Sequence, residues 1–205
     1  MNNYFKILMI VIFCVAGAAS ARAVTSEKTF TISASVPAAL GVNFIASSVD
    51  NANNFTLVTG TNLTFDPMTL NIANGVYLPN HFFAIDVGAA SGAGIPSVTA
   101  TYTEGLNPNN PGKGLGYKST ATFVRVQGSG TTQTEVPLTS HGPKKLLINV
   151  SGEQITAAEI VGGFLRIYLG IVPGGTGTPT GGEPFTNGDK PGSYDGKLLL
   201  SGTIL

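Results

Sequence analysis

Cysteine and tryptophan are almost missing from this sequence. Of its 205 residues only Cys14 is a cysteine, and no residue is a tryptophan. Because Cys14 lies in an apolar N-terminal segment, the rest of the chain can form neither a disulfide framework nor a thiolate metal site. Charged residues are also scarce, at 11%, whereas a disordered tail would carry more charge and fewer apolar residues. The composition therefore predicts one folded domain, held by packing and hydrogen bonds, with a neutral and hydroxyl-rich surface.

The charge balance gives no sign of a surface that binds polyanions. The whole chain carries 11 basic and 11 acidic side chains. Lys6 and Arg22 fall within a predicted export signal, so the remaining chain is slightly acidic. Nucleic acids and anionic lipids are bound by clusters of lysine and arginine, and no such cluster is present. We therefore expect no nucleic-acid partner.

Groups that carry catalysis or bind metals are equally few. The only histidines are His81 and His141, and neither has a second nitrogen or sulfur ligand at metal spacing. Both stand beside predicted turns, so we expect them to face solvent. There is no Gly-x-Ser-x-Gly nucleophile motif and no phosphate-binding glycine loop. The sequence predicts a protein that is not an enzyme, with no catalytic residues, no metal and no cofactor.

The chain begins with the pattern of an export signal. Lys6 is followed by an apolar run over residues 7–15 and by small residues that end in Ala21-Arg22-Ala23. This order is typical of a cleavable secretory signal peptide, and the apolar run is too short to span a bilayer. An uncleaved membrane anchor is the alternative. We expect residues 1–23 to be the signal peptide and residues 24–205 to be exported.

Directly after the signal, polar and apolar residues alternate over residues 28–36. Such an alternation predicts a strand with one apolar face. A strand at the N-terminus of the exported chain can pair within its own domain, or it can leave and complete the sheet of another molecule. On pattern alone the first alternative is the more common. The apolar face consists of Phe30, Ile32, Ala34 and Val36.

The rest of the chain is predicted to be all-β. Short segments rich in β-branched and aromatic residues recur at nearly regular spacing, and turns rich in Gly, Pro and Asn separate them, which is typical of an antiparallel sandwich. Residues 156–161 are predicted to form one helical turn. Residues 173–192, rich in Gly, Thr and Pro, are predicted to form an exposed loop, either displayed for function or a plain connection. The predicted strands are residues 42–45, 55–58, 63–65, 68–72, 82–87, 98–102, 121–126, 146–150, 164–172 and 196–205.

Three segments together resemble a known family. Residues 27–36, Glu-Lys-Thr-Phe-Thr-Ile-Ser-Ala-Ser-Val, are similar to the N-terminal segment of the major pilins of colonisation-factor-antigen type, which belong to the alternate chaperone-usher branch. Ala34 matches the small residue of that segment. Residues 63–68, Leu-Thr-Phe-Asp-Pro-Met, and residues 192–196, Gly-Ser-Tyr-Asp-Gly, resemble two further motifs. This chain is longer than expected for the family, and the excess falls in residues 89–94, 107–116 and 173–189.

The resemblance implies a fold, a function and a location, namely export through the periplasm into a fimbria on the cell surface. Residues 24–36 would be a donor-strand extension, and residues 37–205 would be an incomplete immunoglobulin-like β-sandwich that a neighbouring subunit's strand completes. The donor residues would be Phe30, Ile32, Ala34 and Val36. The partners implied are identical subunits in a head-to-tail filament, a periplasmic chaperone, an outer-membrane usher, and, further along the fimbria, a tip adhesin with a host glycan. The acceptor groove and chaperone contact would be formed by one face of the last strand, Tyr194, Leu198, Leu200 and Ile204.

A different class of function is the alternative. The chain would then be a minor or tip adhesin, or a secreted lectin-like sandwich, that binds a glycan through residues 173–192 or through another insertion. Tip adhesins need no donor strand and usually carry a second domain. The N-terminal strand and the single-domain length therefore favour a structural subunit of the filament, which supports cell adhesion.

Overall fold

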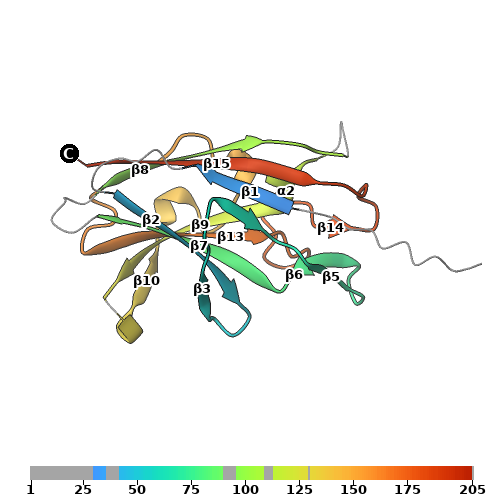
Figure 1. The fold of residues 1–205 in the computed structure, drawn as a ribbon, viewed down its shortest axis with the longest axis horizontal. Coiled ribbons are helices and arrows are strands. Elements are labelled where there is room, and N and C mark those ends of the chain that lie inside the picture. The colour runs from blue at the N-terminus through green and yellow to red at the C-terminus, as the bar shows by residue number, and fades with distance from the viewer. Residues whose placement is uncertain (1–29, 36–41, 90–95, 109–112, 129, 205) are drawn as a thin grey trace, which may run out of the picture.

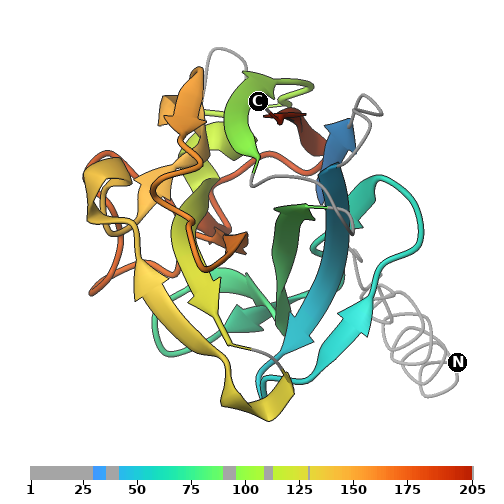
Figure 2. The same cartoon turned by 90° about the vertical axis from the view of Figure 1, so that its left-hand side faces the viewer.

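The computed structural model describes residues 30–35, 42–89, 96–108, 113–128 and 130–204. Within these ranges the protein is all-β, with one α-helical turn, α2 (Leu115–Lys118), and strands that form three sheets. No helix among these residues is long and apolar enough to cross a membrane. The two larger sheets lie one above the other (Figure 1) and surround a common centre when viewed along the long axis (Figure 2).

The first sheet brings the two ends of the described chain together. Its strand β1 lies between the last strand, β15, and the short strand β4, and it is parallel to β15. All other strand pairs in the described ranges are antiparallel. In order across the sheet, the strands are β12 (Glu153–Ile155), β8 (Ser97–Glu104), β15 (Tyr194–Thr203), β1 (Phe30–Ser35) and β4 (Asn62–Thr64).

The second sheet supplies the opposite side of the core, and a third, small sheet lies at one end. The second sheet contains, in order, β10 (Thr134–Pro137), β9 (Ser119–Gln127), β13 (Gly163–Ile171), β7 (His81–Ala89), β2 (Val42–Asp50) and β3 (Phe55–Leu57), and β11 (Lys145–Leu146) also pairs with β9. The third sheet contains β14 (Phe185–Thr186), β6 (Val76–Pro79) and β5 (Met68–Asn71).

The core forms between the inward faces of the two larger sheets. Every second residue of a strand points to the same face, so one apolar face of each strand is buried. On β15 the buried residues include Leu198 and Leu200, whereas Lys197 and Leu199 on the opposite face are exposed. The same alternation runs along β7 and β13, whose inward-facing core residues include Phe83, Ile85, Val87, Leu165, Ile167 and Leu169.

Local hydrogen bonds overturn two of the secondary-structure predictions. Where residues 156–161 were predicted to form a helical turn, residues 157–162 form two consecutive turns, in which Glu159 N–H donates to the Thr156 carbonyl at 3.1 Å and Gly163 N–H donates to the Ile160 carbonyl at 3.2 Å. In the predicted strand 146–150, only Leu146 belongs to a strand. Residues Leu147–Asn149 form a 3₁₀ turn, η3, in which Val150 N–H donates to the Leu147 carbonyl. The remaining 3₁₀ turns are η1 (Gly130–Thr132) and η2 (Thr139–His141).

Residues 173–192 are not exposed throughout, as the sequence suggested. The side chain of Phe185 is fully buried, and its ring packs edge-on against Tyr194 at a centroid distance of 5.0 Å. The buried ammonium of Lys118 lies 2.7 Å from the Asp189 carboxylate and also donates to the Pro184 carbonyl. The first half of the segment is exposed around residues 175–177, but its second half is attached to the core.

Candidate subunit-binding groove

Strand β1 occupies a slot between two strands that are distant from it in sequence. Ile32 is the register partner of Gly196 on β15 and of Leu63 on β4. Figure 1 shows β1 alongside β15 in the upper sheet. Without β1, the facing edges of β15 and β4 would each present unpaired N–H and C=O groups, which is the arrangement that recruits another strand. We call this slot, bounded by β15 and β4, the groove.

The centre of the groove is completely buried. Ile32 and Leu63 have no exposed surface, and Leu198 is only 1% exposed. All three belong to the main apolar core. Burying an isoleucine side chain contributes about 1.5–3 kcal/mol. The side chain of Ile32 therefore contributes both to the stability of the domain and to the retention of β1.

Gly196, on the β15 wall of the groove, is tightly packed. A Cβ at this position would lie 2.1 Å from the hydroxyl oxygen of Tyr102, so the tyrosine ring needs the space that glycine leaves. The Tyr102 hydroxyl donates to Glu104 at 2.9 Å, and Glu104 also accepts the Gly116 N–H at 3.0 Å. Burial, and secondly the negative charge of Glu104, raise the pKa of Tyr102, which keeps its hydroxyl a proton donor.

One end of the groove is fixed by Tyr194. This side chain has no exposed surface, and its hydroxyl donates to the Lys190 carbonyl at 3.0 Å. Burial, with a smaller effect of the Asp189 carboxylate, raises the pKa of Tyr194 to about 12. The start of β15 is thereby tied to the segment that precedes it.

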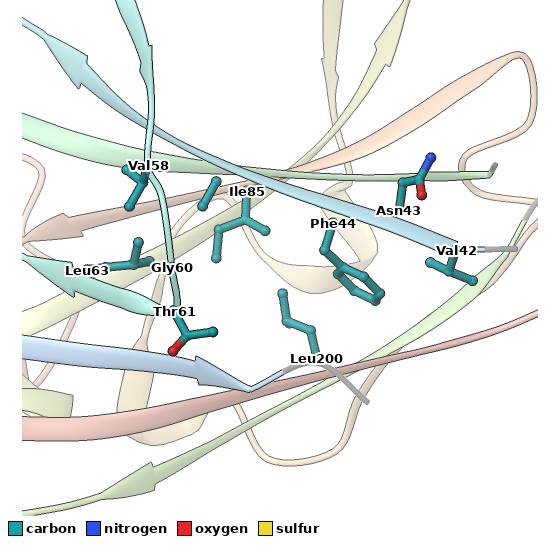
Figure 3. A pocket seen from close by; sticks show the side chains of 10 residues that line it. Val42, Asn43, Phe44, Val58, Gly60, Thr61, Leu63, Ile85 and Leu200 are labelled. Atoms are coloured by element: carbon teal, nitrogen blue, oxygen red, sulfur yellow. The ribbon is translucent and has the colours of Figure 1, made fainter. Parts of the chain in front are cut away.

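At its other end the groove continues past β1 as an apolar hollow of about 450 Å³. The pairing of β1 with β15 stops at Leu199, whereas β8 pairs with β15 as far as Thr203. Figure 3 shows Leu200 and Phe44 projecting toward one another across the hollow, with β1 ending beside it. The other residues that line it include Val42, Ala46, Val58, Leu63 and Ile85.

In the structure, the predicted donor strand pairs with two strands of the same chain. Ile32 is buried in the chain's own core, which is the alternative that the sequence pattern left open. Phe30 and Ala34 are the register partners of Tyr194 and Leu198. Val36 lies outside the described residues. The donor role toward a neighbouring subunit therefore stays a prediction.

The predicted acceptor residues lie along the groove to different extents. Tyr194 and Leu198 are buried opposite β1, and Leu200 lies one position beyond its end. Ile204 follows the last residue of β15 and is half-buried. The sequence reasoning did not identify β4 as the second wall, although Leu63 belongs to one of the three motifs that carried the family resemblance.

Neither histidine points freely into solvent, and the prediction is wrong for His141. This side chain is 8% exposed and lies between two carboxylates, with Nδ1 2.6 Å from Glu153 and Nε2 3.0 Å from Glu159. His81 is half-buried, and its Nε2 lies 3.1 Å from the Thr64 carbonyl oxygen. Within the described ranges, no group of three or more His, Cys, Asp and Glu side chains is arranged to hold a metal ion.

Comparison with known proteins leaves the groove as the main guide to function. No family model, no curated protein and no solved structure matches this chain.

Proposed function

We propose that this protein is a structural subunit of a chaperone-usher fimbria, an adhesive filament on the cell surface. In this proposal the fold is an immunoglobulin-like sandwich that lacks one strand. The N-terminal strand of each subunit completes the sheet of the next. The observation that carries the proposal is the position of β1, which fills a slot between β15 and β4 and forms the single parallel pair among the described strands.

The connectivity of β1 makes exchange between subunits physically simple. The strand precedes the whole sandwich, and only residues 36–41 join it to β2. Its longest pairing, with β15, is parallel, and parallel pairs are slightly less stable per residue than antiparallel ones. Exchange of an identical element between copies replaces one set of contacts with a similar set, so it costs little free energy. The apolar hollow past Leu199 offers a donor from another subunit additional surface to bury.

Head-to-tail exchange of this kind produces a filament. The donor strand and the groove are different surfaces, so each contact is heterologous, and repetition without closure gives an open polymer. A subunit whose groove is empty would expose apolar core, so the proposal includes a periplasmic chaperone that covers the groove. It also includes an outer-membrane usher at which the next subunit's strand replaces the chaperone.

The proposal is tested with protein extracted from the cell surface and run on a denaturing gel without boiling. The wild type and the conservative variant Ile32→Val are expected to give ladders of oligomers. Ile32→Asp is expected to be exported but to give no ladder, because burying a carboxylate in the apolar centre of the groove costs too much free energy. A wild type that runs only as a monomer, or an unchanged ladder from Ile32→Asp, would contradict strand exchange.

A further inference from the structure

A second hollow, of about 480 Å³, lies on the outer face of the second sheet, away from the groove. Phe82 and Tyr168 line it. Their strand neighbours Phe83 and Ile167 are buried in the core, so Phe82 and Tyr168 belong to the opposite, outward face. The volume is within the range of small-molecule sites. Strand exchange uses neither this face nor these residues.

The aromatic wall of this hollow is held in place before any ligand arrives. The rings of Phe82 and Tyr168 pack edge-to-face with a centroid distance of 5.6 Å. The Tyr168 hydroxyl donates to Glu135, and Arg166 holds the same glutamate at 2.9 Å. Arg166 is fixed in turn by two hydrogen bonds to Asp86, at 2.6 and 2.8 Å. A ring that is already ordered loses little conformational entropy when it binds a ligand.

The floor of the hollow is open because residue 170 is a glycine. A Cβ at Gly170 would have its nearest neighbour at 3.8 Å, the hydroxyl oxygen of Thr120, so packing does not require glycine there. At Gly163 of the same strand, a Cβ would lie 2.0 Å from the Val126 carbonyl oxygen, so that glycine has a structural reason. A strand glycine with no packing role marks a place where a ligand can approach the backbone closely.

The polar groups around the hollow favour an anionic ligand. Lys144 is exposed and is the one charged residue among those that line it. Its ammonium forms no ion pair with any described residue. The nearby guanidinium of Arg166 is already paired with two carboxylates, Asp86 and Glu135, so Lys144 is the cation that remains for a ligand. Thr122 and Asn53 add a hydroxyl and an amide to the lining.

We propose that this hollow binds an acidic saccharide. The apolar face of a sugar ring would lie on the Phe82–Tyr168 wall above Gly170, and the carboxylate of the saccharide would pair with Lys144. The hydroxyl and amide groups of Thr122 and Asn53 would hydrogen-bond to the sugar hydroxyls. This site differs from the glycan-binding loop of residues 173–192 that the sequence suggested as an alternative, because Pro173 is the single residue of that loop among those that line the hollow.

Calorimetric titration of the purified exported protein with sialyllactose and with neutral lactose tests the proposal. The wild type is expected to bind sialyllactose about fivefold more tightly than lactose, since an ion pair with an exposed lysine contributes up to about 1 kcal/mol. Gly170→Val should place an isopropyl group where the sugar ring would lie and so weaken binding of both sugars, while a β-branched residue suits the strand. Lys144→Glu, at an exposed position, should lower the affinity for sialyllactose to that for lactose or below, without affecting the fold.

The matched control is Lys197→Ala, which removes an exposed lysine from the outer face of the first sheet. Its affinity for sialyllactose should equal that of the wild type. Three results would overturn the proposal: a wild type that binds neither sugar, equal affinities for sialyllactose and lactose, or unchanged binding by Lys144→Glu. Because strand exchange uses none of the residues that line the hollow, failure of these measurements would leave the proposal of strand exchange untouched.

Discussion

The ring of Tyr102 lies against the backbone of Gly196, closely enough that a Cβ on residue 196 would be 2.1 Å from the tyrosine hydroxyl oxygen. Gly196 is also the register partner of Ile32 on the other side of β15. One glycine therefore lets a tyrosine of β8 pack tightly under the strand that forms the wall of the groove. The packing of the groove and the packing of the core are coupled at this residue.

The first prediction concerns Gly196→Ala. The added methyl group must displace the Tyr102 ring, which is buried and hydrogen-bonded to Glu104, and overpacking of this kind costs about 1–3 kcal/mol. Denaturant unfolding should show this loss. Gly170→Ala is the matched control, because it adds the same methyl group to a strand where the nearest atom is 3.8 Å away. Equal stabilities of the two variants would contradict this account of Gly196.

The second prediction concerns the ion pair between Lys118 and Asp189, whose side chains are 3% and 9% exposed. Lys118→Met leaves the Asp189 carboxylate buried without its cation, which typically costs about 3–5 kcal/mol. The free energy of unfolding should fall by this amount. Lys113→Met removes a lysine that pairs with Glu183 at the exposed surface, and it should leave stability unchanged. If both variants were as stable as the wild type, the Lys118 pair would not hold residues 173–192 to the core.

The third prediction concerns acid stability at Glu159. The backbone N–H of Thr156, and then the hydroxyls of Ser140 and Thr156 and the ring of His141, lower the pKa of Glu159 to about 2. Because the folded pKa lies below the ordinary value of 4.5, the stabilisation is fully present above that value and is lost as the pH falls toward about 2.

The lowered pKa of Glu153 makes stability fall with acid in the same way. Burial alone would raise its pKa, but Lys145 and His141 outweigh burial and lower it.

Because the pKa of Glu159 is lowered in the folded protein, Glu159→Gln should be less stable than the wild type at neutral pH and should approach it near pH 2, as measured by thermal unfolding across this range. A stability difference that stays constant from neutral to acid pH would show that the carboxylate charge is not responsible.

Much of the strand content could be predicted from the sequence, because long apolar alternations leave few alternatives. Residues 164–172, 82–87 and 98–102 were predicted as strands, and β13, β7 and β8 cover them almost completely. The short strands β6, β10, β12 and β14 were missed. Each has only two to four residues, and such strands depend on a partner strand for their hydrogen bonds more than on their own pattern.

The position of β1 shows the limit of sequence reasoning for the groove. The alternation over residues 28–36 predicts a strand, and the structure contains one at Phe30–Ser35. The choice of β15 and β4 as its neighbours depends on contacts with residues far away in sequence. For the same reason the burial of His141 could not be predicted, since Glu153 and Glu159 surround it only after the chain has folded.

The central claim is that the groove accepts the N-terminal strand of another molecule, and peptide binding tests it most directly. Ile32→Asp protein is refolded with a fluorescent peptide of residues 28–36, and binding is followed by fluorescence anisotropy. We predict a stable one-to-one complex with this peptide and no complex with the same peptide carrying aspartate in place of isoleucine. Failure of the unmodified peptide to bind, or equal binding of both peptides, would contradict the claim.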